Sequence, residues 1–96
     1  MATYFVLSTF TEQGIRAGKQ TTQRATAAQE LAHKFGCNMR EIFWTQGRYD
    51  VVTLVEAPDD AAITAFSMAL GGLGNVRTET LRAFTQKEMA DIVSKL

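Results

Sequence analysis

Cysteine, proline, histidine and tryptophan each occur once in the 96 residues. The lone cysteine, Cys37, cannot form a disulfide within the chain. A metal site needs about three well-placed ligands, and one histidine with one cysteine does not supply them. His33 also falls outside the apolar stripe of its predicted helix, a surface position that argues against a role as the axial ligand of a haem. We therefore expect no metal and no cofactor.

The chain also lacks an excess of either charge. Ten basic and ten acidic residues give a formal net charge of zero, and no block of like charge would attract phosphates, so nucleic acid is not an expected partner. No apolar run approaches the roughly 20 residues that span a bilayer. The N-terminal ATYFVLSTFT has no basic region followed by a long apolar run, so we expect a cytoplasmic protein without a membrane partner.

Four segments have the composition of β-strands. The first, residues 3–10, and the third, 49–56, are apolar at both odd and even positions, which is typical of central strands. The second, 38–45, and the fourth, 75–84, mix polar and apolar residues, which favours the sheet edges. Pro58 ends the third strand because proline lacks the amide hydrogen that a sheet needs.

Three segments have helical patterns. Residues 22–35 carry an apolar stripe made mostly of alanine, and a second helix begins at Pro58-Asp59-Asp60 and ends at Gly71-Gly72. A capping box of Thr85 and Glu88 predicts a third helix at the C-terminus, with Met89, Ile92, Val93 and Leu96 on one face. Residues 11–20 are predicted to form a turn and a loop.

The order of these segments is β-α-β-β-α-β with an extra C-terminal helix, which predicts an α+β, ferredoxin-like fold in one domain, residues 1–96. Both crossover helices of this fold lie on one side of the sheet, so the apolar residues on the other side need a cover. A domain this small also buries only about 60% of the surface of its unfolded chain. We therefore predict a homodimer packed through the sheet face, with a pocket between the two sheets; further association of dimers stays open.

Several motifs together resemble the GYD domain family of small bacterial and archaeal proteins. They are GRYD at 47–50, EAPDD at 56–60 and LGNVRTETLRAF at 73–84, with Tyr4 and the TEQG of 11–14 at the start. The family name implies Gly-Tyr-Asp in a row, whereas Arg48 separates Gly47 from Tyr49 here, a spacing that members commonly show. The resemblance implies a dimeric α+β barrel of ferredoxin-like units. The family is largely uncharacterised, so the resemblance implies no catalytic residues.

Candidate ligand-binding residues lie on the central hairpin and the fourth strand: Trp44, Tyr49, Asp50, Thr53, Arg77 and Glu79. Tyr49 and Thr53 share a parity, so both are predicted to point to one face of the sheet. If that face is the inner one, a phenol and a hydroxyl in an apolar pocket would orient a small organic ligand.

Each of these residues also has a structural interpretation. Trp44 and Tyr49 would suit a dimer interface, where amphipathic rings are common. Asp50 could tie down the hairpin turn. Arg77 and Glu79 could pair with each other, or protect an exposed sheet edge from association.

Two functions are consistent with these features. The first is a small-molecule binder or a cofactor-free enzyme of the isomerase or oxygenase type, by analogy with other barrels of this plan. The second is a non-catalytic oligomeric sensor or protein-interaction module that binds another protein through the C-terminal helix.

Overall fold

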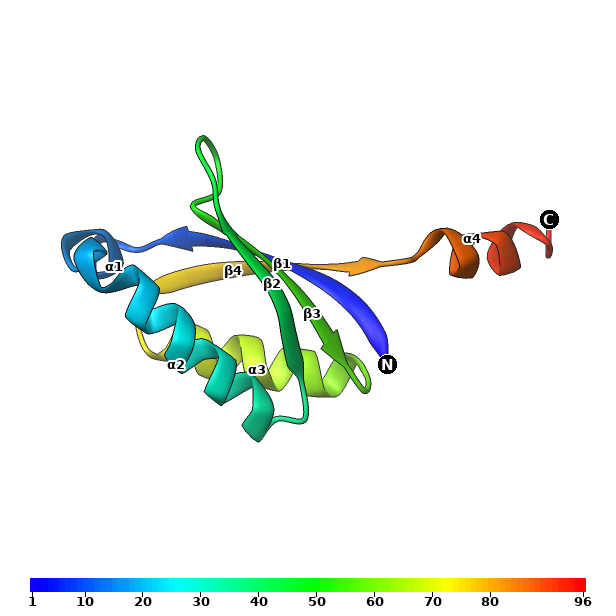
Figure 1. The fold of residues 1–96 in the computed structure, drawn as a ribbon, viewed down its shortest axis with the longest axis horizontal. Helices are drawn as coiled ribbons and strands as arrows, with labels where there is room; N and C mark the ends of the chain where they lie inside the picture. Colours follow the sequence, from blue (N-terminus) through cyan, green and yellow to red (C-terminus); the bar gives the residue numbers. More distant parts are fainter.

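The computed structural model describes all 96 residues, and it contains a four-stranded antiparallel sheet with two long helices on one face (Figure 1). Its elements are β1 (Ala2–Phe10), α1 (Glu12–Arg16), a 3-10 turn η1 (Gly18–Gln20), α2 (Thr21–Lys34), β2 (Asn38–Trp44), β3 (Val51–Ala57), α3 (Asp60–Gly72), β4 (Val76–Ala83) and α4 (Gln86–Val93).

The strands lie in the order β2-β3-β1-β4, so the two most apolar strands are central and the two more polar ones form the edges. This order, with α2 and α3 as the crossovers, is the predicted ferredoxin-like fold, and the prediction is confirmed. The agreement has a simple cause. Apolar side chains are best buried at the centre of a sheet, where a strand has a neighbour on each side. An edge strand is more exposed to water, so polar side chains are tolerated there.

Alternate residues of the central strands face the helices. Tyr4 and Val6 of β1 and Val55 of β3 are 3%, 1% and 0% exposed, and they pack under α2 and α3 with Ile63 and Phe66 of α3. The intervening residues of the same strands point to the opposite face. The period of two along a strand therefore divides the sheet into a helix-covered face and an open face.

The helices begin and end where the sequence predicts. The Asp59 carboxylate accepts a hydrogen bond from the Ala62 amide and caps α3, and Gly36 follows α2 at a φ of +75°, a conformation that suits a helix end. Ala28 and Ala32 are the buried residues of α2. Small side chains at these positions let α2 lie close to the sheet.

The predicted loop over residues 11–20 is wrong, because this segment forms α1 and η1. Thr11 caps α1 by accepting a hydrogen bond from the Gly14 amide. Thr11 and Gln13 also bind the segment before β4: the Thr11 hydroxyl donates to the Gly74 carbonyl at 2.5 Å, and the Gln13 amide group donates to the Leu73 carbonyl at 3.2 Å. These contacts between residues about 60 positions apart order a segment that looks like a loop in sequence.

The last helix, α4, lies beyond the end of β4 and away from α2 and α3 (Figure 1). The molecule is accordingly elongated, with extents of 48 × 30 × 17 Å. None of the helices combines the length and the hydropathy that crossing a bilayer requires.

Candidate functional site

All four strands contribute apolar side chains to the open face of the sheet, and the two edge strands also place charged residues there. In the strand register, one row of neighbours is Phe43, Val52, Leu7 and Glu79, and the next is Glu41, Leu54, Phe5 and Leu81. Phe43, Leu81 and Phe5 are 56%, 44% and 39% exposed. No helix of the chain lies over this face (Figure 1). A large apolar surface that is exposed to solvent often marks a site that binds another molecule.

Tyr49 reaches the margin of the open face. Its hydroxyl donates a hydrogen bond to the Glu79 carboxylate at 2.9 Å, and this bond raises the pKa of the Tyr49 phenol. Thr53, in contrast, is 5% exposed on the helix-covered face, where its hydroxyl donates to the Val6 carbonyl at 3.3 Å. The prediction that Tyr49 and Thr53 share a face is wrong, because β3 begins only at Val51 and strand parity does not extend back to Tyr49.

Asp50 holds the β2–β3 hairpin against the end of β1. Its carboxylate accepts a hydrogen bond from the Phe10 amide at 2.8 Å, and its own amide donates to the Ser8 carbonyl at 2.9 Å. Its carbonyl accepts from the Thr45 amide at 2.9 Å. These three bonds give Asp50 the role of tying down the turn, which was one of its two predicted roles.

The remaining candidate residues divide between the two faces. Trp44 ends β2 on the helix-covered side, where its indole nitrogen donates to the Thr21 hydroxyl at 2.9 Å. Arg77 is exposed on the open face opposite Thr9, and it forms no ion pair with Glu79 within the chain. The structure therefore brings Tyr49, Glu79 and Arg77 to one face and leaves Trp44 and Thr53 on the other.

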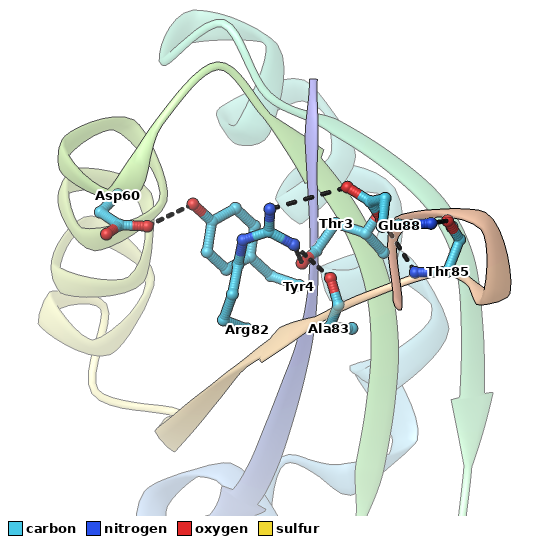
Figure 2. Close-up of polar contacts among 7 residues, drawn as sticks. All are labelled: Thr3, Tyr4, Asp60, Arg82, Ala83, Thr85 and Glu88. Carbon is cyan, nitrogen blue, oxygen red and sulfur yellow. Dashed lines mark hydrogen bonds and ion pairs between the residues drawn. The ribbon is translucent and has the colours of Figure 1, made fainter. Parts of the chain in front are cut away.

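A polar cluster that the sequence did not indicate joins the sheet to α4 (Figure 2). The Arg82 guanidinium lies 5.5 Å from the centroid of the Tyr4 ring and 4.4 Å from that of Phe84. It also donates to the Thr3 carbonyl at 3.3 Å and lies 3.8 Å from the Glu88 carboxylate of α4. Arg82 thus contacts β1, the end of β4 and α4 at once.

Tyr4 extends this cluster to α3. Its hydroxyl donates a 2.5 Å hydrogen bond to the Asp60 carboxylate (Figure 2). This bond, together with burial, raises the pKa of the Tyr4 phenol to about 12. The link could be found only after the fold was known, because 56 residues separate the partners.

The raised pKa of Tyr4 predicts a loss of stability at high pH. The folded chain holds the phenolic proton more tightly than the unfolded chain does, so this contribution is complete below about pH 10 and is lost as the pH rises toward 12. We expect the difference in unfolding free energy between the wild type and Tyr4→Phe to shrink over that range, measured by urea denaturation. Tyr49, whose pKa is also raised, is present in both proteins, so its contribution cancels in the difference. A difference that stays constant from about pH 9 to pH 12 would contradict the assignment.

The helix α4 is formed and oriented by its N-terminus. Thr85 and Glu88 make both bonds of the predicted capping box, which is confirmed. These bonds lower the pKa of the Glu88 carboxyl, so the group stays charged beside Arg82. The apolar side of α4 remains exposed: Met89, Ile92 and Val93 are 43%, 38% and 49% exposed. A helix that is held at one end and apolar along one side suits docking to another surface.

Comparison with known proteins identifies the family. The sequence profile of the GYD domain matches residues 4–93. The chain belongs to the GYD domain family. The family resemblance that the sequence motifs carry is thereby confirmed over nearly the whole chain.

Two relatives come from Thermus thermophilus. The chain is 34% identical over 97 residues to a protein of this bacterium named "Glutamine synthetase and cystathionine beta-lyase binding protein", and the match covers 100% of this chain and 99% of the relative. It also resembles the crystal structure of TTHA0845 from the same organism, with a TM-score of 0.58, 29% identity and coverage of 88% of this chain and 95% of that one. The first relative is thus named for binding two enzymes.

Proposed function

We propose that this protein is a non-catalytic binding module that associates with other protein chains through two apolar surfaces, the open face and the exposed side of α4. The observation that carries the proposal is that the chain's own helices cover neither surface. The name of the Thermus relative, which describes a protein that binds two enzymes, supports a function of this kind.

The occupant proposed for the open face is a second copy of the chain. Four strands about 4.8 Å apart and about seven residues long at roughly 3.3 Å each give a flat area of roughly 450 Å². Side chains that project from the sheet add to this flat area. The surface that packing would bury therefore approaches the roughly 800 Å² per partner of a standard interface. A sheet packs well on another sheet, and identical chains most often pair about a two-fold axis.

The charges of the open face lie at its margins and leave its centre apolar. Arg40 pairs with Glu56 at 3.2 Å, and Tyr49 satisfies Glu79. Face-to-face packing would therefore bury phenylalanine, leucine and valine. Glu41 and Arg77, which have no ion-pair partner within the chain, lie on the edge strands and would stay in contact with water at the rim. The small organic ligand predicted between the two sheets would meet Tyr49, Glu79 and Arg77 in such a dimer, and it stays a prediction.

The occupant proposed for α4 is a partner protein with an apolar groove. Met89, Ile92 and Val93 follow the spacing i, i+3 and i+4, which places them along one side of α4. Leu96, predicted on the same face, lies three residues beyond the end of the helix. The capping box and Arg82 fix the helix before it binds. Pre-organisation of this kind reduces the conformational entropy that binding would otherwise cost.

The experiment that tests this proposal measures binding to glutamine synthetase and cystathionine β-lyase from the organism that encodes this chain. We expect Ile92→Ser to weaken binding to at least one of these enzymes about 3- to 10-fold, since Ile92 is 38% exposed and binding would bury only that part of a side chain whose full burial is worth about 1.5–3 kcal/mol. Asp91→Ser, on the polar side of the same helix, is the matched control and should leave the affinity unchanged. Isothermal titration calorimetry provides the readout.

Three outcomes would contradict the role of α4. If the wild type binds neither enzyme, the relative's partners do not extend to this chain. If Ile92→Ser binds as well as the wild type, the enzymes contact another surface. Should Ile92→Ser dissociate the homodimer instead, α4 covers a second copy and not a different protein.

A further inference from the structure

A cavity of about 110 Å³ lies on the helix-covered side of the sheet, opposite the open face. It is enclosed by the N-terminal half of α2, the C-terminal end of α3 and the ends of the strands beneath them. Eleven of its 16 lining residues are hydrophobic. The neighbouring part of the core is filled by Phe66, Val6 and Val55, whereas α2 contributes mainly Ala25, Ala27 and Ala28 to the cavity. Small side chains therefore leave this end of the core hollow.

One polar group inside the cavity has no partner. Ser8 of β1 lines the cavity and is 4% exposed, and its hydroxyl takes part in none of the side-chain hydrogen bonds of the chain. Every polar side-chain atom that is fully sealed from solvent does have a partner, so the Ser8 hydroxyl opens onto the cavity beside it. The hydroxyl is therefore accessible to a molecule in the cavity and can form a hydrogen bond with it.

Trp44 and Thr21 are among the residues that line the cavity. The hydrogen bond from the Trp44 indole to the Thr21 hydroxyl, 2.9 Å long, joins the end of β2 to the start of α2. Trp44 is 43% exposed, so its ring contacts both the cavity and solvent. A ligand in the cavity would lie next to the only tryptophan of the chain.

Charge limits what the cavity can accept. Arg24 is the only charged residue among those that line it. Its guanidinium already donates to the Ala17 carbonyl at 2.8 Å and the Gly14 carbonyl at 3.1 Å, and it lies 5.6 Å from the centroid of the Phe10 ring. Neither a carboxylate for an organic cation nor an unengaged cation for an anion is present. The lining therefore favours a neutral molecule.

From these observations we infer that the cavity binds a small, neutral, single-ring aromatic compound that carries one hydrogen-bonding group, with that group on the Ser8 hydroxyl. At about 110 Å³, the cavity is smaller than the apolar cavity of about 150 Å³ that holds benzene. The ligand is therefore limited to one ring, part of which would extend through the open side of the cavity. This site lies on the opposite side of the sheet from the open face, so it does not depend on the proposed function. Trp44 and Thr53, two of the residues predicted to bind a ligand between sheets, line this cavity instead.

Phenol is the probe that tests the inference. Titration of the full chain should change the fluorescence of Trp44 to saturation and raise the melting temperature with concentration. Ser8→Ala should weaken phenol binding about fivefold, the equivalent of one neutral hydrogen bond of about 1 kcal/mol. The same variant should bind benzene as the wild type does, since benzene makes no such bond.

A second pair of variants tests the position of the site. Ala25→Leu should fill the cavity and weaken phenol at least tenfold, whereas Ala61→Leu, the same change at an exposed position of α3, should leave binding unchanged. The absence of a saturable response in the wild type would overturn the inference, as would undiminished binding by Ala25→Leu. If Ala25→Leu does not fold, equal phenol affinities of Ser8→Ala and the wild type would overturn the assignment of Ser8.

Discussion

Gly14→Ala is expected to destabilise the fold by about 3 kcal/mol or more, which places it among the large single-residue effects. A Cβ atom at residue 14 would lie 2.0 Å from the carbonyl oxygen of Asn75 and 2.9 Å from its carbonyl carbon. Both are far inside van der Waals contact, and both belong to backbone. The clash can be relieved only if α1 moves away from the segment that leads into β4.

Hydrogen bonds oppose that movement. The same Asn75 carbonyl accepts from the Thr11 amide at 3.1 Å, and the Thr11 hydroxyl both donates to the Gly74 carbonyl and accepts from the Gly14 amide. Separating the two segments would weaken the two bonds from Thr11 to Asn75 and Gly74, each worth about 1 kcal/mol net. The expected loss therefore combines a steric term with the loss of the contacts that order residues 11–20.

Gly18→Ala is the matched control for Gly14→Ala. A Cβ on Gly18 would meet no atom within 4 Å, and its φ is not positive. This substitution should be neutral or stabilise by up to about 1 kcal/mol, because alanine restricts the unfolded chain more than glycine does. Thermal unfolding separates the two variants, since about 1 kcal/mol shifts the melting temperature of a domain of this size by about 4–8 °C. Equal melting temperatures for both variants would show that α1 can move away from the segment before β4 without a loss of stability, which would contradict the prediction.

The topology could be predicted from sequence because it depends on repeating patterns. Strands that are apolar at both parities become central, and an alanine stripe marks a helix that lies close to the sheet. Each of these signals is spread over a whole strand or helix, so no single residue decides it. The capping box of Thr85 and Glu88 is equally local and was equally predictable.

The candidate site depended on details that no local pattern contains. Parity would place Tyr49 with Thr53, but the strand begins two residues after Tyr49, and the phenol turns to Glu79. The contact of Tyr4 with Arg82 requires the register between β1 and β4, which pairs these two residues. The cavity beside Ser8 depends on the tertiary structure, because it forms only where small residues of α2 lie above one particular end of the sheet.

Phe5→Asp is expected to convert the proposed homodimer into monomers. Phe5 lies on β1, a central strand, and its register partners are Leu54 on one side and Leu81 on the other. Phe5 is 39% exposed in the single chain, so pairing would bury only that remainder, and the larger effect comes from the aspartate, which would lose the hydrogen bonds of water in the interface. A two-fold interface contains the substitution twice, so the dissociation constant should rise by a factor of about 10² or more. Sedimentation velocity over a range of concentrations measures the change.

Met68→Asp provides the comparison, because it introduces the same charge at an apolar side chain that is 73% exposed on α3, away from the open face. The proposal requires Met68→Asp to stay dimeric and Phe5→Asp to become monomeric while both keep the circular dichroism of the wild type. If Phe5→Asp loses its fold, Leu81→Asp on the edge strand β4 tests the same surface with less disturbance of the sheet. A wild type that sediments as a monomer at every concentration would leave the open face without its proposed occupant. A monomer could still bind a partner protein through α4, so the open face and α4 can be tested separately.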